Sequence, residues 1–260
     1  NDNYWGDKAK ASEVIVRTIS DAKARTQELQ AGNIDGYDLV APADQPGLKT
    51  AGFQIMNRPP FNILYLGMNQ KNKDLADPKV RQAIAYAIDK DALIKQALPE
   101  GSKAAINFMP ENVTGYNAGV TTYAYNPEKA KSLLKEAGKE GLTLKFNYPT
   151  GVSRPYMPTP EDTYVALKAQ LEAVGIKVTP VANKWAPDYL DKIQGSSDHD
   201  IHLLGWTGDY NDPDNFIGVF FGGQANEWGS TTPSCSRRSR TPEASATPRL
   251  RRRRTRRSAR

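Results

Sequence analysis

The sequence predicts an α/β domain, and three observations lead to that fold class. Apolar runs of strand length alternate with amphipathic helical segments between about residues 59 and 229, which is typical of helices that cover a sheet. Proline stands at several expected helix starts and glycine at several expected helix ends, as helix geometry favours. The composition, with 38% hydrophobic and 25% charged residues, is that of an ordinary globular protein.

The first 58 residues contain only short elements. A helix is predicted over residues 20–30, since Ser20 or Asp21 can cap its start and Gly32 can end it. Residues 34–40 predict a turn that leads into a strand. Because apolar residues are few here, residues 1–58 are interpreted as part of a lobe whose remainder is missing.

Residues 59–229 are predicted to form an α/β domain of alternating strands and helices. The first helix begins at Asp77-Pro78, and Val80, Ile84, Ala87 and Ile88 form its buried stripe. The segment 99–125 is long for a plain connection, which favours a binding or hinge role. The predicted strands are 62–68, 142–148, 176–181 and 200–204, and the later helices are 90–98, 126–138, 160–174 and 187–194.

The positive net charge of +6 comes from the last 31 residues. Residues 230–260 hold 11 of the arginines, no lysine and the only cysteine, Cys235, whereas residues 1–229 have a net charge of −4. The main part therefore gives no electrostatic reason to expect nucleic acid. The tail is predicted to be disordered. It is either a basic arm for nucleic acid or anionic surfaces, or an out-of-frame product that is not native, and the second interpretation is favoured.

Several functional classes find no support in the sequence. No apolar run is long enough for a transmembrane helix, and a single cysteine excludes an intrachain disulfide. Strand alternation places His199 and His202 on opposite faces, so a shared metal is not expected. No familiar catalytic motif is present. We therefore expect neither an enzyme nor a cofactor or metal site.

A block from Gly205 to Phe216 holds the first candidate residues. It follows the apolar run 201–204 and places Trp206 three residues before Asp209, among Gly, Asn, Asp and Pro. Trp offers a flat apolar platform with one donor, and a carboxylate accepts a cation such as an ammonium group. The alternatives are a core position for Trp206 and an Asx-type turn at Asp209.

Arg154 is the second candidate, as one of only five arginines before the tail. A guanidinium matches a carboxylate with two parallel hydrogen bonds, although without further context a solvated surface arginine is the more ordinary interpretation. Prolines on either side of Tyr156 stiffen this loop. Trp185 stands at a strand-to-helix junction, and in open α/β sheets ligands gather outside the carboxyl ends of strands; a core position is its alternative.

Two segments resemble a known family. Residues 77–90 (DPKVRQAIAYAIDK) and 125–138 (YNPEKAKSLLKEAG) are similar to signatures of the extracellular solute-binding proteins of the peptide/nickel type, which serve ABC importers. The block 205–216 and Arg154-Pro155-Tyr156 resemble the dipeptide-binding branch. The resemblance spans about residues 10–228, and the tail departs from it.

The resemblance implies a periplasmic-binding-protein fold of type II, with two lobes that close on the ligand. Members are about twice as long as this chain, so the resemblance implies a fragment, with residues 1–58 as the remnant of the first lobe and hinge and residues 59–229 as the second, ligand-binding lobe. The resemblance further implies that Asp209 holds the α-ammonium of a dipeptide and Arg154 its α-carboxylate. Tyr156, Trp185 and Trp206 match positions that line the site.

The predicted function is therefore binding of dipeptides or short peptides outside the cytoplasmic membrane and delivery to the membrane subunits of an ABC importer. The location is expected to be periplasmic or at the cell surface, with a lipid anchor left open, and the chain itself begins without a leader; a monomer is expected. Alternative cargoes within the family are longer oligopeptides, nickel chelates and haem. An alternative of another class is a nucleic-acid-associated protein that acts through the basic tail.

Overall fold

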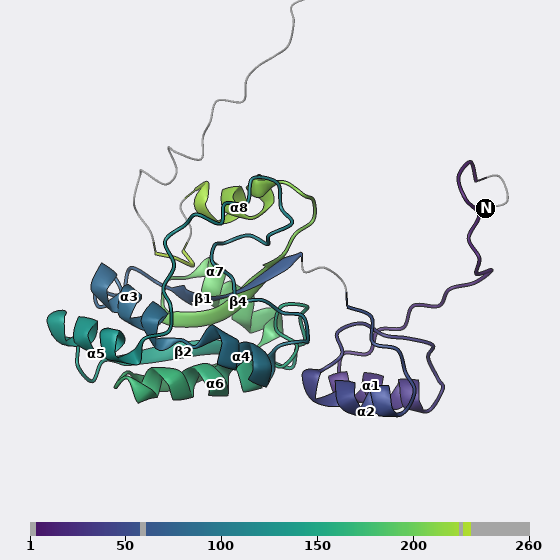
Figure 1. Ribbon diagram of the computed structural model, residues 1–260, viewed down its shortest axis with the longest axis horizontal. Coiled ribbons are helices and arrows are strands. Elements are labelled where there is room, and N and C mark those ends of the chain that lie inside the picture. The colour runs from purple at the N-terminus through teal and green to yellow at the C-terminus, as the bar shows by residue number, and fades with distance from the viewer. Residues whose placement is uncertain (1–3, 58–60, 224–225, 230–260) are drawn as a thin grey trace, which may run out of the picture.

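The computed structural model describes residues 4–57, 61–223 and 226–229 (Figure 1). Strands and helices alternate through most of this chain, which confirms the predicted α/β class. The elements are α1 (Ala22–Gln30), η1 (Pro42–Asp44), α2 (Gln45–Thr50), β1 (Asn62–Met68), α3 (Pro78–Ala87), α4 (Lys90–Ala97), α5 (Pro127–Glu136), β2 (Thr143–Thr150), α6 (Pro160–Ala173), β3 (Lys177–Lys184), η2 (Trp185–Tyr189), α7 (Leu190–Gly195), β4 (Ile201–Thr207), η3 (Pro213–Asn215) and α8 (Ile217–Phe221).

The strands form one mixed sheet in the order β1-β4-β2-β3. β2 runs parallel to both β3 and β4, whereas β1 runs antiparallel to β4. Thr150 pairs with Lys184 at the end of β2 and β3, and Asn62 pairs with Thr207 at the end of β4. The carboxyl ends of three strands therefore meet at one edge of the sheet, together with the start of β1.

Helices α3 to α6 cover one face of the sheet (Figure 1). Leu144 and Phe146 of β2 and Ile201 and Leu203 of β4 point into this layer, two residues apart along each strand, as pleated strands require. The opposite face carries α7 and α8, and there Leu204 packs on Tyr189 and Ile193. The sheet is thus packed on both faces, so its edges are the places left for ligands.

Side-chain caps confirm the predicted helix starts. Asp77 accepts a hydrogen bond from the Lys79 amide ahead of α3, Asp89 caps α4 in the same way, and Asn126 caps α5. Proline occupies the first turn of α3, α5 and α6, where its missing N–H costs nothing. These caps satisfy amide donors that the helices cannot pair internally.

The predicted strand over residues 34–40 is wrong. The segment is irregular, with bends at Asp35 and Asp38 and with Leu39 in the left-handed region at φ 65°. A strand needs a neighbouring strand to form a ladder, and the one sheet of the described residues is made of β1 to β4 and does not include this segment. The helix predicted over 187–194 begins two residues earlier and is divided between η2 and α7.

Helices α1 and α2 and the loops that join them form a small unit beside the sheet-containing body, and the described chain before α1 runs away from this unit (Figure 1). Lys49 Nζ forms an ion pair of 2.7 Å with Glu100, which follows α4. The proposed division into a remnant of 1–58 and a lobe of 59–229 stays a prediction. The predicted tail of 230–260 lies outside the described residues.

Within the part of the chain that the structure describes, no helix combines the length and apolar character needed to cross a membrane. Nor do the described residues contain a group of three or more His, Cys, Asp and Glu side chains arranged to hold a metal ion.

The predicted placement of the two histidines on opposite faces is wrong. Their rings lie 4.9 Å apart and both are buried, because His199 precedes β4 and does not follow its alternation. The Glu227 carboxylate lies 3.0 Å from His202 Nε2 and accepts a hydrogen bond of 2.6 Å from the Tyr65 hydroxyl. This polar cluster joins residues 226–229 to β1 and β4.

Burial, with a smaller contribution from neighbouring His202, lowers the pKa of His199 from 6.5 to about 4. Between these values the unfolded chain binds more protons at this residue than the folded chain does, so stability falls as the pH is lowered. Because asparagine does not titrate, we expect the free energy of unfolding of His199→Asn to fall less than that of the parent between pH 6.5 and pH 4. Urea unfolding over pH 6.5 to 4 measures the difference, since carboxylates titrate alike in both proteins; equal losses would contradict the assignment.

Candidate ligand-binding site at the carboxyl edge of the sheet

The structure places all five predicted site residues at the carboxyl edge of the parallel strands. Arg154 and Tyr156 lie in the loop after β2, Trp185 directly follows β3, and Trp206 and Asp209 lie at and just beyond the end of β4. The parallel pairing described above thus collects residues that are far apart in the sequence. Open α/β sheets bind ligands at this edge.

Arg154 stacks on Trp185. The guanidinium carbon lies 4.1 Å from the centre of the indole ring, within the range of a cation–π contact. Trp185 in turn stacks on Tyr189 at 6.0 Å, and the Tyr189 hydroxyl donates to the carbonyl groups of Asn147 and Leu203. Tyr189 thus links the Trp185 ring, and with it the guanidinium, to strands β2 and β4.

Arg154 keeps unused hydrogen-bonding capacity. Its Nε is buried without a hydrogen-bond partner in the structure, and its side chain forms no ion pair with any described residue. A buried donor without a partner is uncommon, because leaving it unpaired costs about 1–3 kcal/mol. The arrangement is that of a cation positioned for an anion such as a carboxylate.

Tyr156 lies over the backbone of β4. A Cβ atom on Gly205 would stand 2.3 Å from Tyr156 Cδ2 and 2.5 Å from the Ile63 carbonyl oxygen, so only glycine permits this contact. Burial raises the pKa of Tyr156 to about 12; the Arg154 guanidinium opposes this rise and the Glu227 carboxylate adds to it. The phenol therefore stays neutral near pH 7 and keeps its proton as a donor.

Asn215 holds the other half of the site in place. Its Oδ1 accepts a hydrogen bond of 2.7 Å from the Asp209 amide and one of 3.4 Å from Trp206 Nε1. Asp209 itself is exposed, and its carboxylate forms no ion pair with a described residue. The alternative of an Asx-type turn at Asp209 is not seen, because the Asp209 carboxylate accepts no hydrogen bond from a described residue.

The block after β4 is packed against the start of β1. The Gly208 amide donates to the Phe61 carbonyl at 2.9 Å, and the rings of Phe61 and Phe216 meet edge to face at 5.6 Å. Asn211 bonds in both directions with the long segment 99–125, accepting from the Thr114 amide and donating to the Asn112 carbonyl. The segment that carries Asp209 is thereby held on two sides.

Sequence reasoning missed two positioning residues, Tyr189 and Asn215. Tyr189 is fully buried, and nothing in its sequence context distinguishes it from an ordinary core aromatic. Asn215 stands in a run of turn-forming residues, which was the only signal for it.

The structure brings Arg154 and Trp185 into contact, whereas Arg154 and Asp209 lie on separate loops without an ion pair between them. A cavity of about 570 Å³ opens beside Tyr156, and the other four predicted residues do not line it.

Gly205 is predicted to be required for the position of Tyr156. In Gly205→Ala the added methyl group would overlap the Tyr156 ring and the Ile63 carbonyl. Overpacking of this kind costs about 1–3 kcal/mol, which urea unfolding measures. Gly195→Ala is the matched control, because a Cβ there meets no atom within 4 Å; equal stability of the two variants would show that the Tyr156 contact is not constrained.

Comparison with known proteins agrees with this architecture. Residues 1–228 match the family model described as bacterial extracellular solute-binding proteins, family 5 Middle. The chain is similar to the dipeptide-binding protein of Escherichia coli, with 37% identity over 88% of this chain and 43% of that protein. It is also similar to haem-binding protein A of Haemophilus influenzae, with 32% identity over 85% of this chain and 40% of that protein.

Solved structures show the same relationship. The ABC transporter-associated periplasmic binding protein DppA from Helicobacter pylori, in complex with the peptide STSA, is 30% identical with a TM-score of 0.70 over 84% of this chain and 41% of that one. The chain thus spans about two fifths of the length of these relatives. With a family match over residues 1–228, the chain belongs to the bacterial extracellular solute-binding proteins of family 5.

Proposed function

We propose that this chain contributes the ligand-binding lobe of a dipeptide-binding protein that works outside the cytoplasmic membrane and delivers its cargo to an ABC importer. In this role Arg154 receives the α-carboxylate of the peptide and Asp209 its α-ammonium group. Tyr156, Trp185 and Trp206 line the site. The protein acts as a monomer whose partners are the peptide and the membrane subunits of the importer.

The observation that supports the proposal most directly is the Arg154–Trp185 contact. The guanidinium is held at 4.1 Å from the ring centre and retains a buried Nε without a partner. A cation in this state is prepared for an anionic ligand, since little side-chain freedom is left to lose on binding. The names of the E. coli and H. pylori relatives agree with a peptide as that ligand.

The two end charges would set the length of the cargo. Two residues of extended chain span about 7 Å, so a cation and an anion on neighbouring loops can recognise both ends of a dipeptide at once. Once the two lobes close over the ligand and exclude water, a peptide of another length would leave one end unpaired, and an unpaired buried charge costs about 3–5 kcal/mol. Selection then rests on the termini, whereas the aromatic walls accept varied side chains.

Haem is the second candidate cargo, since one relative is named as a haem-binding protein. The described residues around Arg154 offer a cation for a propionate group. Asp209 could not hold the second propionate of haem, because its exposed carboxylate would repel that group. A peptide with a free ammonium group uses both charged residues and is therefore preferred.

Arg154→Ala and Asp209→Asn are each expected to weaken dipeptide binding by roughly 100-fold, because truncating one partner of a desolvated charge pair costs about 2–5 kcal/mol. Arg154→Lys should recover only part of the loss, since an ammonium group lacks the planar fork of a guanidinium. Calorimetric titration with a free dipeptide measures the three affinities.

Matched controls lie at the opposite edge of the sheet. Lys177→Ala removes a positive charge at the exposed start of β3, and Glu140→Gln removes a negative charge at an exposed position just before β2. Both variants should bind the dipeptide like the parent. The site assignment is wrong if Arg154→Ala and Asp209→Asn bind as tightly as these controls.

A further inference from the structure

A short segment, Asn226–Gly229, binds the sheet at the edge opposite the cargo site, and we call it the clasp. Its first three carbonyl groups accept hydrogen bonds, in chain order, from Asn69 Nδ2 at 3.1 Å, His199 Nε2 at 3.1 Å and the Gln70 amide at 2.8 Å. Gly229 ends the clasp at φ 58°, and a Cβ atom there would stand 2.1 Å from Asn69 Oδ1. The donors follow β1 or precede β4, so the clasp joins these strands where β1 ends and β4 begins.

The clasp also carries a buried carboxylate. Glu227 is 4% exposed, and its Oε1 accepts a hydrogen bond of 2.6 Å from the Tyr65 hydroxyl and lies 3.0 Å from His202 Nε2. Among the described residues, His202 is the one basic side chain within ion-pair distance of this carboxylate. Because a buried carboxylate is costly without donors, these two contacts hold the Glu227 side chain inside and keep the clasp against β1 and β4.

Both histidines of this cluster use Nε2 to hold the clasp and leave Nδ1 without a partner. The Nε2 atom of His199 must carry the proton, because the group that it meets is a carbonyl oxygen, which only accepts. The Nδ1 atoms of His199 and His202 are buried and have no hydrogen-bond partner among the described residues. A second proton on His199 would therefore place an N–H group in a buried position without an acceptor, which is unfavourable.

The charges around His199 do not offset this cost. Burial lowers its pKa from 6.5 to about 4 and His202 adds to the fall, whereas Glu227 and Asp200 oppose it. The Asp200 carboxylate already accepts hydrogen bonds from a β2 amide and from Asn72 Nδ2. Further titratable side chains on the elements around the cluster are Tyr65 and Lys71 from β1 and the turn after it, Tyr156 after β2, Tyr189 and Lys192 from η2 and α7, and Asp198. The closed clasp therefore disfavours a second proton on His199.

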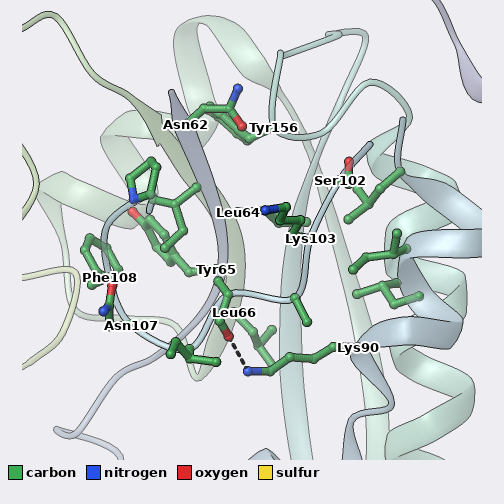
Figure 2. Close-up of a pocket in the computed structure, with 18 of the residues that line it drawn as sticks. Asn62, Leu64, Tyr65, Leu66, Lys90, Ser102, Lys103, Asn107, Phe108 and Tyr156 are labelled. Carbon is green, nitrogen blue, oxygen red and sulfur yellow. Dashed lines mark hydrogen bonds between the residues drawn. The ribbon is translucent and has the colours of Figure 1, made fainter. Parts of the chain in front are cut away.

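Aromatic rings connect the clasp with the cargo site. Trp228 of the clasp lies 5.2 Å from the Tyr65 ring and 6.4 Å from the Phe220 ring of α8. Phe220 in turn meets Trp206 edge to face at 5.4 Å. Figure 2 shows Tyr65 beside Phe108 of the long segment 99–125, at 4.9 Å between ring centres. The Trp206 ring therefore rests on a cluster of rings that the clasp completes.

We propose that the clasp positions Trp206 for the cargo and that it stays closed only while His199 is neutral. A second proton favours the open form, in which the His199 ring reaches water. Opening removes Trp228 from behind Phe220 and leaves Trp206 without support. Linkage makes the effect reciprocal, so that a cargo which needs Trp206 in place also holds the clasp closed. The positioning role rests on the proposed function, whereas the response to protons does not.

Hydrogen exchange at the Gln70 amide, followed by NMR in the 260-residue chain, reports opening of the clasp, because this amide donates to the Trp228 carbonyl. Since the His199 ring regains its ordinary pKa of 6.5 in the open form, against about 4 in the closed form, the opening equilibrium should rise about 30-fold between pH 7.5 and pH 5. His199→Gln keeps an amide donor in place of Nε2 and does not titrate, so its equilibrium should change by less than about threefold. Comparison of the two proteins at each pH cancels the intrinsic pH dependence of exchange, and equal profiles would overturn the proposal.

His202→Gln is the matched control. It also keeps a donor for Glu227 but leaves His199 in place, so most of the rise should remain. Loss of the rise in His202→Gln together with its retention in His199→Gln would assign the response to the other ring and overturn the proposal. Circular dichroism checks that both variants fold. Where His199→Gln does not fold, the parent must show the rise and His202→Gln must keep it.

The cargo tests the positioning role. A free dipeptide at about 100 times its dissociation constant should slow exchange at Gln70 at least roughly tenfold at pH 7.5, because the open form binds it poorly. Trp228→Leu should weaken dipeptide binding by roughly tenfold, whereas Trp5→Leu, the same change at a ring that is 92% exposed, should not. Unchanged affinity in Trp228→Leu, or a bound dipeptide that leaves exchange unaltered, would overturn the positioning role. A parent that binds no dipeptide overturns the proposed function and the positioning role together, while the pH profile at Gln70 still decides the response to protons.

Discussion

The parallel pairing of β2 with both β3 and β4 is the constraint on which the site depends. It brings the carboxyl ends of three strands to one edge, and with them the loops that carry Arg154, Trp185 and Asp209. The Tyr189 hydroxyl reinforces this edge by donating to carbonyl groups of β2 and β4. Without the parallel register the guanidinium would lose its indole support, and the two charged residues would not share an edge.

The architecture could be predicted largely from local patterns. Asp77 and Pro78, Asn126 and Pro127, and the glycines after the helices are strong signals, because caps and backbone conformation act over a few residues. The strand expected over 34–40 failed for the opposite reason, since a strand depends on a partner that the segment itself cannot reveal. The two histidines were misplaced because alternation was applied to His199, which lies before the strand begins.

The residues of the site could be predicted from the sequence, but the hydrogen bonds and packing contacts that hold them in place could not. The resemblance named Arg154, Tyr156, Trp185, Trp206 and Asp209, and the fold places them at one edge, while their roles in binding stay a prediction. Asn215 holds that edge through a hydrogen bond to Asp209, and Tyr189 holds it through hydrogen bonds to carbonyl groups far away in the sequence; no spacing pattern in the sequence predicts either contact. Gly205 shows the same limit: its importance comes from an aromatic ring 49 positions earlier in the sequence, at Tyr156.

The most direct test of the account is a calorimetric titration of the chain with one dipeptide in its free form and in its N-acetylated form. If Asp209 recognises the ammonium group, the free dipeptide binds and the acetylated one does not, because acetylation removes the charge and leaves the carboxylate unpaired. Equal affinity for the two forms would contradict recognition of the termini. In that case the cargo would be held by other contacts, and the assignment of Arg154 and Asp209 as a matched pair would fail.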